Sequence, residues 1–186
     1  MGLSLATSTL VGQNIGAGRM KRAVQTSNIS CAISFSVLVA SGLIFFFIAR
    51  PMTAFFIPKG GEAIDESVTL IRILTICFGF VGLQQVLTGT LRGAGDTLAP
   101  MLLAIISLWI LRFPLAYVLS KHTALGAVGI WWAVAISIMA SAILASIYYL
   151  RGDWKKRRLL DEVRSDAASL EDSAERQMAM EEGLPF

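Results

Sequence analysis

Charge, cysteine and histidine are all scarce in this sequence, and each scarcity excludes a class of protein. Only 16% of the 186 residues are charged, whereas 55% are hydrophobic, and the mean hydropathy is +0.66. A soluble domain must cover its core with polar surface, so this composition predicts a membrane protein instead. Cys31 and Cys77 lie in apolar stretches and imply no disulfide framework. The single histidine, His122, leaves no metal-spaced cluster and no catalytic triad, so enzyme chemistry is not expected.

The charges that do occur are unevenly distributed. Residues 151–158 carry five basic side chains against one acid, and residues 159–186 carry eight acids against two bases. The sequence pI of about 9.1 therefore gives no indication of nucleic acid binding. We expect residues 159–186 to form an acidic tail that is either weakly helical or disordered.

Four apolar stretches are long enough to cross a bilayer, which takes ~20 residues of helix. They are residues 28–48, 68–91, 98–120 and 126–150. Residues 2–15 are also uncharged but would reach only ~21 Å of the ~30 Å core. We interpret them as the end of a helix whose beginning is absent, as in a truncated or split gene product or an expression fragment; the alternative is a short interfacial or re-entrant helix. The predicted fold is an all-α, multi-pass transmembrane bundle of four full spans plus one N-terminal half-helix.

Basic residues gather at every second loop, which predicts the orientation in the cell membrane. Arg19, Lys21 and Arg22 follow the half-helix, Arg92 lies between the second and third spans, and the basic cluster 151–158 follows the fourth. Because basic loops favour the cytoplasm, these loops and the C-terminal tail are expected there.

Small residues recur at the spacing of close helix contacts. Ala133, Ser137, Ser141 and Ala145 form an i, i+4 stripe, and Gly12 with Gly16 and Gly89 with Gly93 form GxxxG pairs. These patterns predict a packed bundle rather than helices alone in lipid.

Two glycine-rich elbows end helices that run toward the predicted cytoplasmic side. Both contain Gly-Ala-Gly followed by a charge, and glycine past a helix end readily adopts the left-handed conformation. A phosphate-binding loop is disfavoured because the second elbow follows a helix and lacks a third glycine. We interpret both as helix stops, the second with a local pair between Arg92 and Asp96. The elbow residues singled out are Gly12, Gln13, Gly16 and Gly18 in the first, and Arg92, Gly93, Gly95 and Asp96 in the second.

Several ordered motifs now resemble a known family. They are VGQNIGAG at residues 11–18, LRGAGDT at 91–97, WILRFPLAY at 109–117 with Pro114, and GAVGIWW at 126–132. Together they resemble the C-terminal lobe of MATE (multidrug and toxic compound extrusion) transporters over about residues 3–158. The resemblance implies a partial lobe in residues 1–158, comprising the end of family helix 8 and helices 9 to 12. It further implies an antiporter that exports drugs and organic cations in exchange for Na⁺ or H⁺, with a missing N-terminal lobe as partner.

Ionisable and polar residues inside the spans are the candidate functional residues. A charge at the bilayer centre costs at least ~2.5 to 3.5 kcal/mol, which makes Arg112 a candidate. It could line the cavity, meet a missing helix, or bond the carbonyl freed by Pro114, whereas Arg72 could simply snorkel to the surface. Gln84 is preferred over Gln85 as a cavity residue, because adjacent helical side chains point ~100° apart. Thr75 lies on the same predicted span as Gln84, and Trp109 is the aromatic residue expected to contact substrate.

No aspartate or glutamate lies inside any predicted span, although coupling to Na⁺ or H⁺ needs a carboxylate in a dry cavity. Some family branches carry an acid midway along helix 10, but residues 80–84 have none, so the coupling carboxylate is expected in the missing part. We expect no resident cofactor, no metal site and no transport by this chain alone. A non-transporting assembly half, a decayed gene product and a lipid-linked oligosaccharide flippase of a related superfamily are the alternatives. A small multidrug resistance exporter is disfavoured because it needs a membrane-embedded glutamate.

Overall fold

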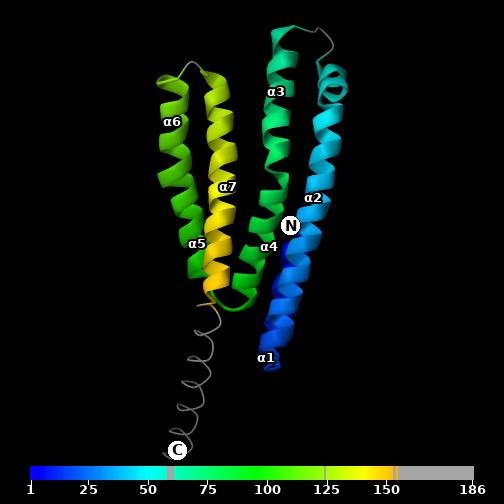
Figure 1. The fold of residues 1–186 in the computed structure, drawn as a ribbon, viewed down its shortest axis with the longest axis vertical. Coiled ribbons are helices and arrows are strands. Elements are labelled where there is room, and N and C mark those ends of the chain that lie inside the picture. Colours follow the sequence, from blue (N-terminus) through cyan, green and yellow to red (C-terminus); the bar gives the residue numbers. More distant parts are fainter. Residues whose placement is uncertain (58–60, 124, 153, 155–186) are drawn as a thin grey trace, which may run out of the picture.

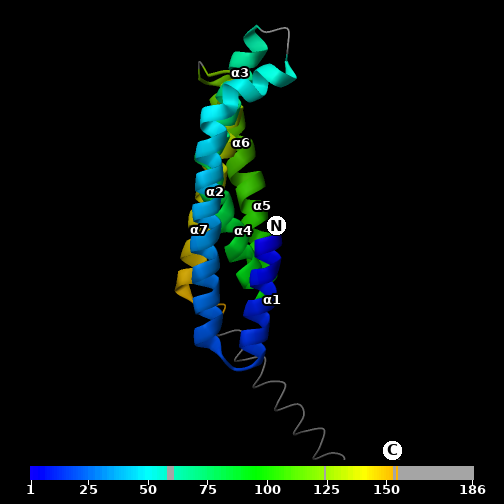
Figure 2. The same cartoon turned by 90° about the vertical axis from the view of Figure 1, so that its right-hand side faces the viewer.

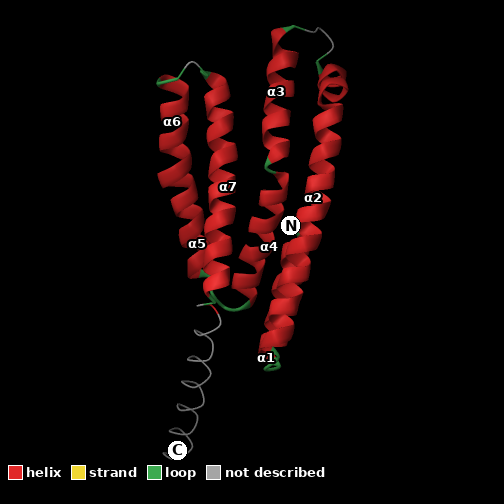
Figure 3. Ribbon diagram, viewed as in Figure 1, coloured by secondary structure: helices red, strands yellow, loops and turns green. Residues whose placement is uncertain are grey.

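The computed structural model describes residues 1–57, 61–123, 125–152 and 154, and every regular element in these residues is helical (Figures 1 and 3). The predicted all-α class is therefore confirmed. The acidic tail 159–186 lies outside the described residues. The elements in chain order are α1 (Gly2–Gly16), α2 (Met20–Phe56), α3 (Glu62–Ile76), α4 (Phe78–Gly93), α5 (Leu98–Ile105), η1 (Ile106–Arg112), α6 (Phe113–Lys121) and α7 (Ala127–Arg151).

The short helix α1 and the long helix α2 form an antiparallel pair (Figure 2). They are joined by the first glycine elbow, where Gly18 has φ of 69° and so favours glycine. α2 is longer than the predicted stretch 28–48, because helix continues through Lys21 and Arg22 at one end and past Arg50 at the other. Pro51 lies inside α2, and near it the end of the helix turns away from the axis (Figure 2), as expected where proline removes a hydrogen bond.

The predicted span 68–91 is not one straight helix. α3 and α4 are bent by 47° at the break around Cys77, and only together do they reach the length and hydropathy of a membrane span. α4 carries Gly79 and Gly82, where an added Cβ would meet side chains of α2 within 2.8 Å. Two glycines weaken the helix near the break, and α2 packs too closely there to admit larger residues.

The third predicted span is continuous but contains a π-helical segment. Residues Leu98–Lys121 form one apolar stretch of 24 residues, made of α5, η1 and α6. Pro114 lies at the start of α6, just after the π segment. Because proline has no backbone N–H, it donates no hydrogen bond to the preceding turn. A wider π turn is one way for a helix to accommodate the lost hydrogen bond.

The described helices include three that are long and apolar enough to cross a membrane, or four when the bent pair α3–α4 counts as one span. This agrees with the four predicted spans and supports a multi-pass membrane protein. Both elbows and the end of α7 lie at one end of the bundle, whereas the α2–α3 and α6–α7 connections lie at the other (Figure 1). The loops with most basic residues thus share one end.

Small residues provide the closest helix contacts. A Cβ added to Gly89 would collide with the backbone of Ser4, and one added to Gly93 would collide with Ser8, so α1 and α4 meet along a pair of small-residue faces. Gly12 also lies here, since a Cβ added to it would be 3.2 Å from the Gly93 carbonyl oxygen. The stripe on α7 is fully internal, since Ala133, Ser137, Ser141 and Ala145 are all 3% exposed or less.

The core near the elbows gathers residues from both ends of the sequence. Val11 of α1, Leu91 of α4, Tyr149 of α7 and Trp154 pack in one cluster. Trp154 stacks on Tyr149 and donates a hydrogen bond from its indole nitrogen to the Tyr149 carbonyl, at 3.0 Å. These contacts hold the helices together at the end predicted to face the cytoplasm.

Candidate functional site

One face of α4 lines a cavity inside the bundle. Val81, Gln84, Gln85, Thr88 and Arg92 recur at the spacing of successive helical turns, which places them on the same side of the helix. The opposite face carries Val86 and Leu87, which are at most 2% exposed. α4 is thus amphipathic within the protein, with its polar face toward the cavity.

The cavity has a volume of about 220 Å³ and lies where α4, α5 and α7 meet. α5 contributes apolar groups from Pro100, Leu103 and Ala104. α7 contributes Ser141 and Ala145, two members of its small-residue stripe. The small side chains of α7 leave the space that the polar residues of α4 face.

A hydrogen bond joins α4 and α7 at the wall of the cavity. The Gln84 amide nitrogen donates to the Ser141 hydroxyl over 2.7 Å. Gln85 lines the same cavity, and its backbone carbonyl accepts a hydrogen bond from the Ser4 hydroxyl of α1, at 2.7 Å. Gln84 therefore lines the cavity, as proposed from the sequence, and also links α4 to α7 by a hydrogen bond.

Arg112 of η1 bonds to α7 rather than to its own helix. Its Nε atom donates to the Ser137 hydroxyl over 3.0 Å, while the Ser137 hydroxyl donates to the Val134 carbonyl at 2.8 Å. Ser107, also in η1, donates to the Ser137 carbonyl at 3.3 Å. Ser137 is thus the centre of a polar network inside the bundle, one turn from Ser141.

Trp109 and Pro114 lie away from the cavity. The Trp109 side chain is 63% exposed and stacks on Phe113, with ring centroids 5.2 Å apart. The structure therefore places Trp109 on an outer face of the described helices. Pro114 acts through backbone geometry, at the junction of η1 and α6.

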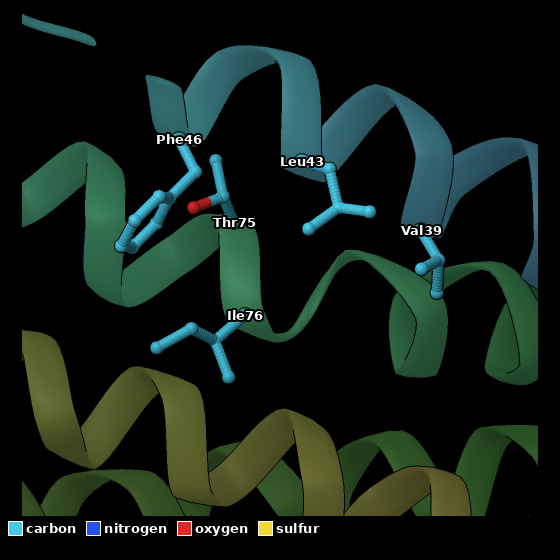
Figure 4. Close-up of a pocket in the computed structure, with 6 residues that line it drawn as sticks. Val39, Leu43, Phe46, Thr75 and Ile76 are labelled. Atoms are coloured by element: carbon cyan, nitrogen blue, oxygen red, sulfur yellow. The ribbon is translucent and has the colours of Figure 1, made fainter.

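Thr75 lies at a second, apolar hollow of about 130 Å³ between α2 and α3. In Figure 4, Val39, Leu43 and Phe46 of α2 point toward the segment that carries Thr75, whereas the Ile76 side chain extends away from α2. The Thr75 hydroxyl donates to the Arg72 carbonyl at 3.0 Å, so it is satisfied within its own helix. Thr75 and Gln84 thus line different hollows.

The second elbow directs Asp96 away from Arg92. The Asp96 carboxylate is 5% exposed and accepts hydrogen bonds from the Ala99 backbone N–H at 3.2 Å and from the Tyr148 hydroxyl at 2.5 Å. Asp96 therefore bonds the first turn of α5 and ties it to α7, whereas Arg92 is exposed and lines the cavity. The bonds that the structure records for Asp96 replace the local pair with Arg92 considered from the sequence.

The elbow glycines have different roles. Gly18 and Gly95 have φ of 69° and 86° and turn the chain, whereas Gly12 and Gly93 allow α1 and α4 to approach. Gln13 and Gly16 are exposed.

Two residues of these sites were not singled out as functional from the sequence. Ser141 was recognised only as a member of the packing stripe, and its contact with Gln84 depends on how α4 and α7 align. Tyr148 lies near the end of an apolar span, and its hydroxyl bonds Asp96, which lies 52 positions away in sequence. Ser141 could have been found as a polar residue inside an apolar helix. No local feature of the sequence indicates that Tyr148 contacts Asp96.

Comparison with known proteins decides the family. A family model described as MatE matches residues 1–118. The chain belongs to the MatE family. The resemblance drawn from the four ordered motifs of this MatE chain is thereby confirmed.

Similar curated proteins are named as multidrug resistance proteins. The chain is 31% identical over 163 residues to the probable multidrug resistance protein NorM of Thermotoga maritima, covering 88% of this chain and 35% of that protein. It is 28% identical to the probable multidrug resistance protein YpnP of Bacillus subtilis, covering 87% of this chain and 36% of that protein. The MatE chain thus spans about a third of the length of these relatives.

A solved structure shares the fold. It is an inward-facing multidrug resistance MATE family transporter of the MOP superfamily, matched with a TM-score of 0.77 and 19% identity. The match covers 84% of this chain and 36% of the transporter chain. At this identity the likeness shows the helical arrangement, and it agrees with the family assignment.

Proposed function

We propose that this chain forms part of the C-terminal lobe of a MATE antiporter, which exports small amphiphilic or cationic compounds in exchange for Na⁺ or H⁺. The observation that carries this proposal is the cavity between α4, α5 and α7, crossed by the hydrogen bond from Gln84 to Ser141. The multidrug resistance names of its relatives support the substrate class.

Polar groups inside a membrane bundle support transport rather than packing alone. A buried amide or hydroxyl costs free energy unless it is hydrogen bonded, and a cavity can offer water or substrate as a partner in addition to a neighbouring helix. Here Gln84, Gln85 and Thr88 all face the cavity from α4, and Ser141 faces it from α7. Such groups can exchange protein partners for water or substrate as the lobes move between access states.

Coupling to Na⁺ or H⁺ requires a carboxylate that another part of the transporter would supply. The predicted spans contain no aspartate or glutamate that could bind and release Na⁺ or H⁺ in a dry cavity. We therefore place the coupling carboxylate in an N-terminal lobe, which would be the functional partner of this chain in the bilayer. The C-terminus is proposed to be cytoplasmic, and the chain is proposed to move its substrate without chemical change.

Efflux from vesicles tests the proposal. The chain would be reconstituted alone, and separately with the remaining helices of the Thermotoga maritima relative, and loaded with a fluorescent organic cation. We expect no gradient-driven efflux from the chain alone, and efflux under a Na⁺ or H⁺ gradient from the assembled protein.

Each result bears on a different alternative. Efflux by the chain alone would contradict the proposed dependence on a second lobe. A stable assembly that does not export under either gradient would contradict transport and favour a non-transporting assembly half. Replacement of Gln84 with leucine in the assembled protein should reduce efflux, whereas Gln13→Leu at the exposed first elbow should not.

A further inference from the structure

The cavity between α4, α5 and α7 has a positive charge and no negative one among its described lining residues. Within the described part of the chain, Arg92 is the only charged side chain that lines it. An acidic group entering this cavity would meet Arg92 as a partner, and a cationic group on the same compound would lie away from Arg92. The remaining lining residues are polar or apolar: Val81, Gln84, Gln85, Thr88, Pro100, Leu103, Ala104, Ser141 and Ala145.

The elbow geometry explains why Asp96 does not neutralise the charge of Arg92. Asp96 follows Arg92 by four positions, the spacing of an ion pair in a continuous helix. However, α4 ends at Gly93 and the backbone turns at Gly95, so the Asp96 carboxylate bonds Ala99 and Tyr148 instead. Within the part of the chain that the structure describes, no carboxylate is paired with Arg92.

Further donors face the same space. Thr88 lies one turn before Arg92 on the cavity face of α4, with its hydroxyl available as a donor. Ser141 accepts its hydrogen bond from Gln84 and therefore keeps its own hydroxyl proton for donation. Guanidinium and hydroxyl donors together form charge-assisted hydrogen bonds to carboxylate, phosphate or sulfonate oxygens.

The cavity also has an apolar wall opposite these donors. Pro100, Leu103 and Ala104 of α5 face the polar side of α4 across a volume of about 220 Å³. This volume is below the ~300 to 1,000 Å³ of typical drug pockets, so it suits one ring or a short alkyl group with its polar head.

We propose that this cavity binds the acidic group of a small anionic or zwitterionic amphiphile. Arg92 pairs with the acid, Thr88 and Ser141 donate hydrogen bonds to it, and the apolar part of the compound packs on Leu103 and Pro100. The inference rests on the proposed function in one respect, since it assigns an acidic group to the transported compounds. A phospholipid of the adjacent leaflet offers the same phosphate chemistry as a free solute.

Equilibrium binding to the full chain in phosphatidylcholine nanodiscs tests the site without any gradient. The probes are naphthyl phosphate and naphthylmethylammonium, which share a ring and differ in charge. Isothermal titration should show the phosphate binding at least about tenfold more tightly, a difference of about 1.4 kcal/mol. Equal affinities, or tighter binding of the cation, would overturn the proposal.

Variants assign the binding to this cavity. Arg92→Gln should weaken naphthyl phosphate binding about tenfold, and the matched change Arg19→Gln, at an exposed base of the other elbow, should leave it unchanged. Leu103→Trp keeps the charge of Arg92 but fills the apolar side of the cavity, and should abolish binding. If Arg19→Gln weakens binding as much as Arg92→Gln does, or if Leu103→Trp has no effect, the site is not this cavity.

Two further measurements keep the result interpretable. The thermal midpoint of each variant, read from tryptophan fluorescence, establishes that it is folded, and Arg92→Lys, which preserves the charge, should restore part of the affinity. Discs containing phosphatidylglycerol distinguish the two sources of phosphate. Competition with naphthyl phosphate would identify a lipid headgroup as the occupant, and its absence would identify a free solute. If cation export requires a second lobe but naphthyl phosphate does not bind, only this inference fails.

Discussion

The Nε atom of Arg112 lies 3.0 Å from the hydroxyl of Ser137, and this hydrogen bond joins η1 to α7 inside the bundle. The intramembrane arginine considered from the sequence thus finds a neutral partner on a neighbouring helix. Because the Ser137 hydroxyl also donates to Val134, the serine is oriented as an acceptor for Arg112.

Ser137→Ala should destabilise the protein by about 1 to 3 kcal/mol, because it leaves the Arg112 Nε–H without its acceptor in a low-dielectric environment. The control is Ser146→Ala on the same helix, whose hydroxyl donates only to the Ala142 carbonyl one turn earlier, at 2.7 Å. Thermal unfolding in detergent, followed by tryptophan fluorescence, measures both. Equal losses in the two variants would show that Arg112 does not depend on Ser137.

The bond from Gln84 to Ser141 should appear as a coupling free energy between α4 and α7. A double-mutant cycle with Gln84→Leu and Ser141→Ala should give about 0.6 to 1.7 kcal/mol, the range found for hydrogen bonds between membrane helices. Gln85→Leu paired with Ser141→Ala is the matched cycle and should give a value near zero. Strictly additive effects for Gln84 would mean that the bond contributes nothing to stability.

Gly89→Ala should weaken the contact between α1 and α4, because its new Cβ would overlap the Ser4 carbonyl oxygen. Overpacking of this kind costs about 1 to 3 kcal/mol, which should lower the unfolding midpoint. Gly2→Ala on α1 is the control, since nothing lies within 4 Å of its added Cβ. An unchanged midpoint for Gly89→Ala would show that the two helices can separate without loss.

Tyr148→Phe should loosen the second elbow. It removes the hydroxyl that donates to the buried Asp96 carboxylate, and hydrogen bonds to charged groups contribute about 1.5 to 3 kcal/mol. Hydrogen exchange of the backbone amides of residues 94–99 should become faster than in the parent protein. Tyr117→Phe, at a residue that is 57% exposed, should leave that exchange rate unaltered, and a similar acceleration would contradict the role of Asp96.

Accessibility of single cysteines should establish the orientation. In a background with Cys31 and Cys77 replaced by alanine, a membrane-impermeant maleimide added to intact cells should label Thr123→Cys. It should not label Ala17→Cys until the cells are permeabilised, because basic loops such as the one that contains Arg19 favour the cytoplasm. The reverse labelling pattern would invert the proposed topology.

Much of the helical arrangement could be predicted from the sequence because apolar length and glycine position are local properties. The spans predicted at residues 98–120 and 126–150 agree closely with α5–η1–α6 and α7. The bend at Cys77 was not predicted, because hydropathy indicates whether a segment suits the bilayer and not whether its helix is straight. The assignment of residues 1–158 to the C-terminal lobe stays a prediction.

The candidate site could be predicted only in part. Gln84 stood out because an amide is costly within an apolar helix, and the structure places it at the cavity. Thr75 shares its predicted span with Gln84 but lies at a different hollow, since nine positions at ~100° each place the two side chains on opposite faces of a helix. Trp109 stood out as an aromatic residue away from helix ends, but which face it occupies depends on how α5, η1 and α6 pack.

The sequence by itself determined that this is a multi-pass helical membrane protein of the MatE family, because composition, span length and the two elbows require no knowledge of distant contacts. Only the tertiary structure decided which groups its charged side chains contact. Arg92 and Asp96 are four positions apart, yet the turn at Gly95 sends Asp96 to Tyr148 and leaves Arg92 at the cavity. Electrostatic partners are set by the distances between helices, and those distances follow from the packing of small residues along the whole bundle.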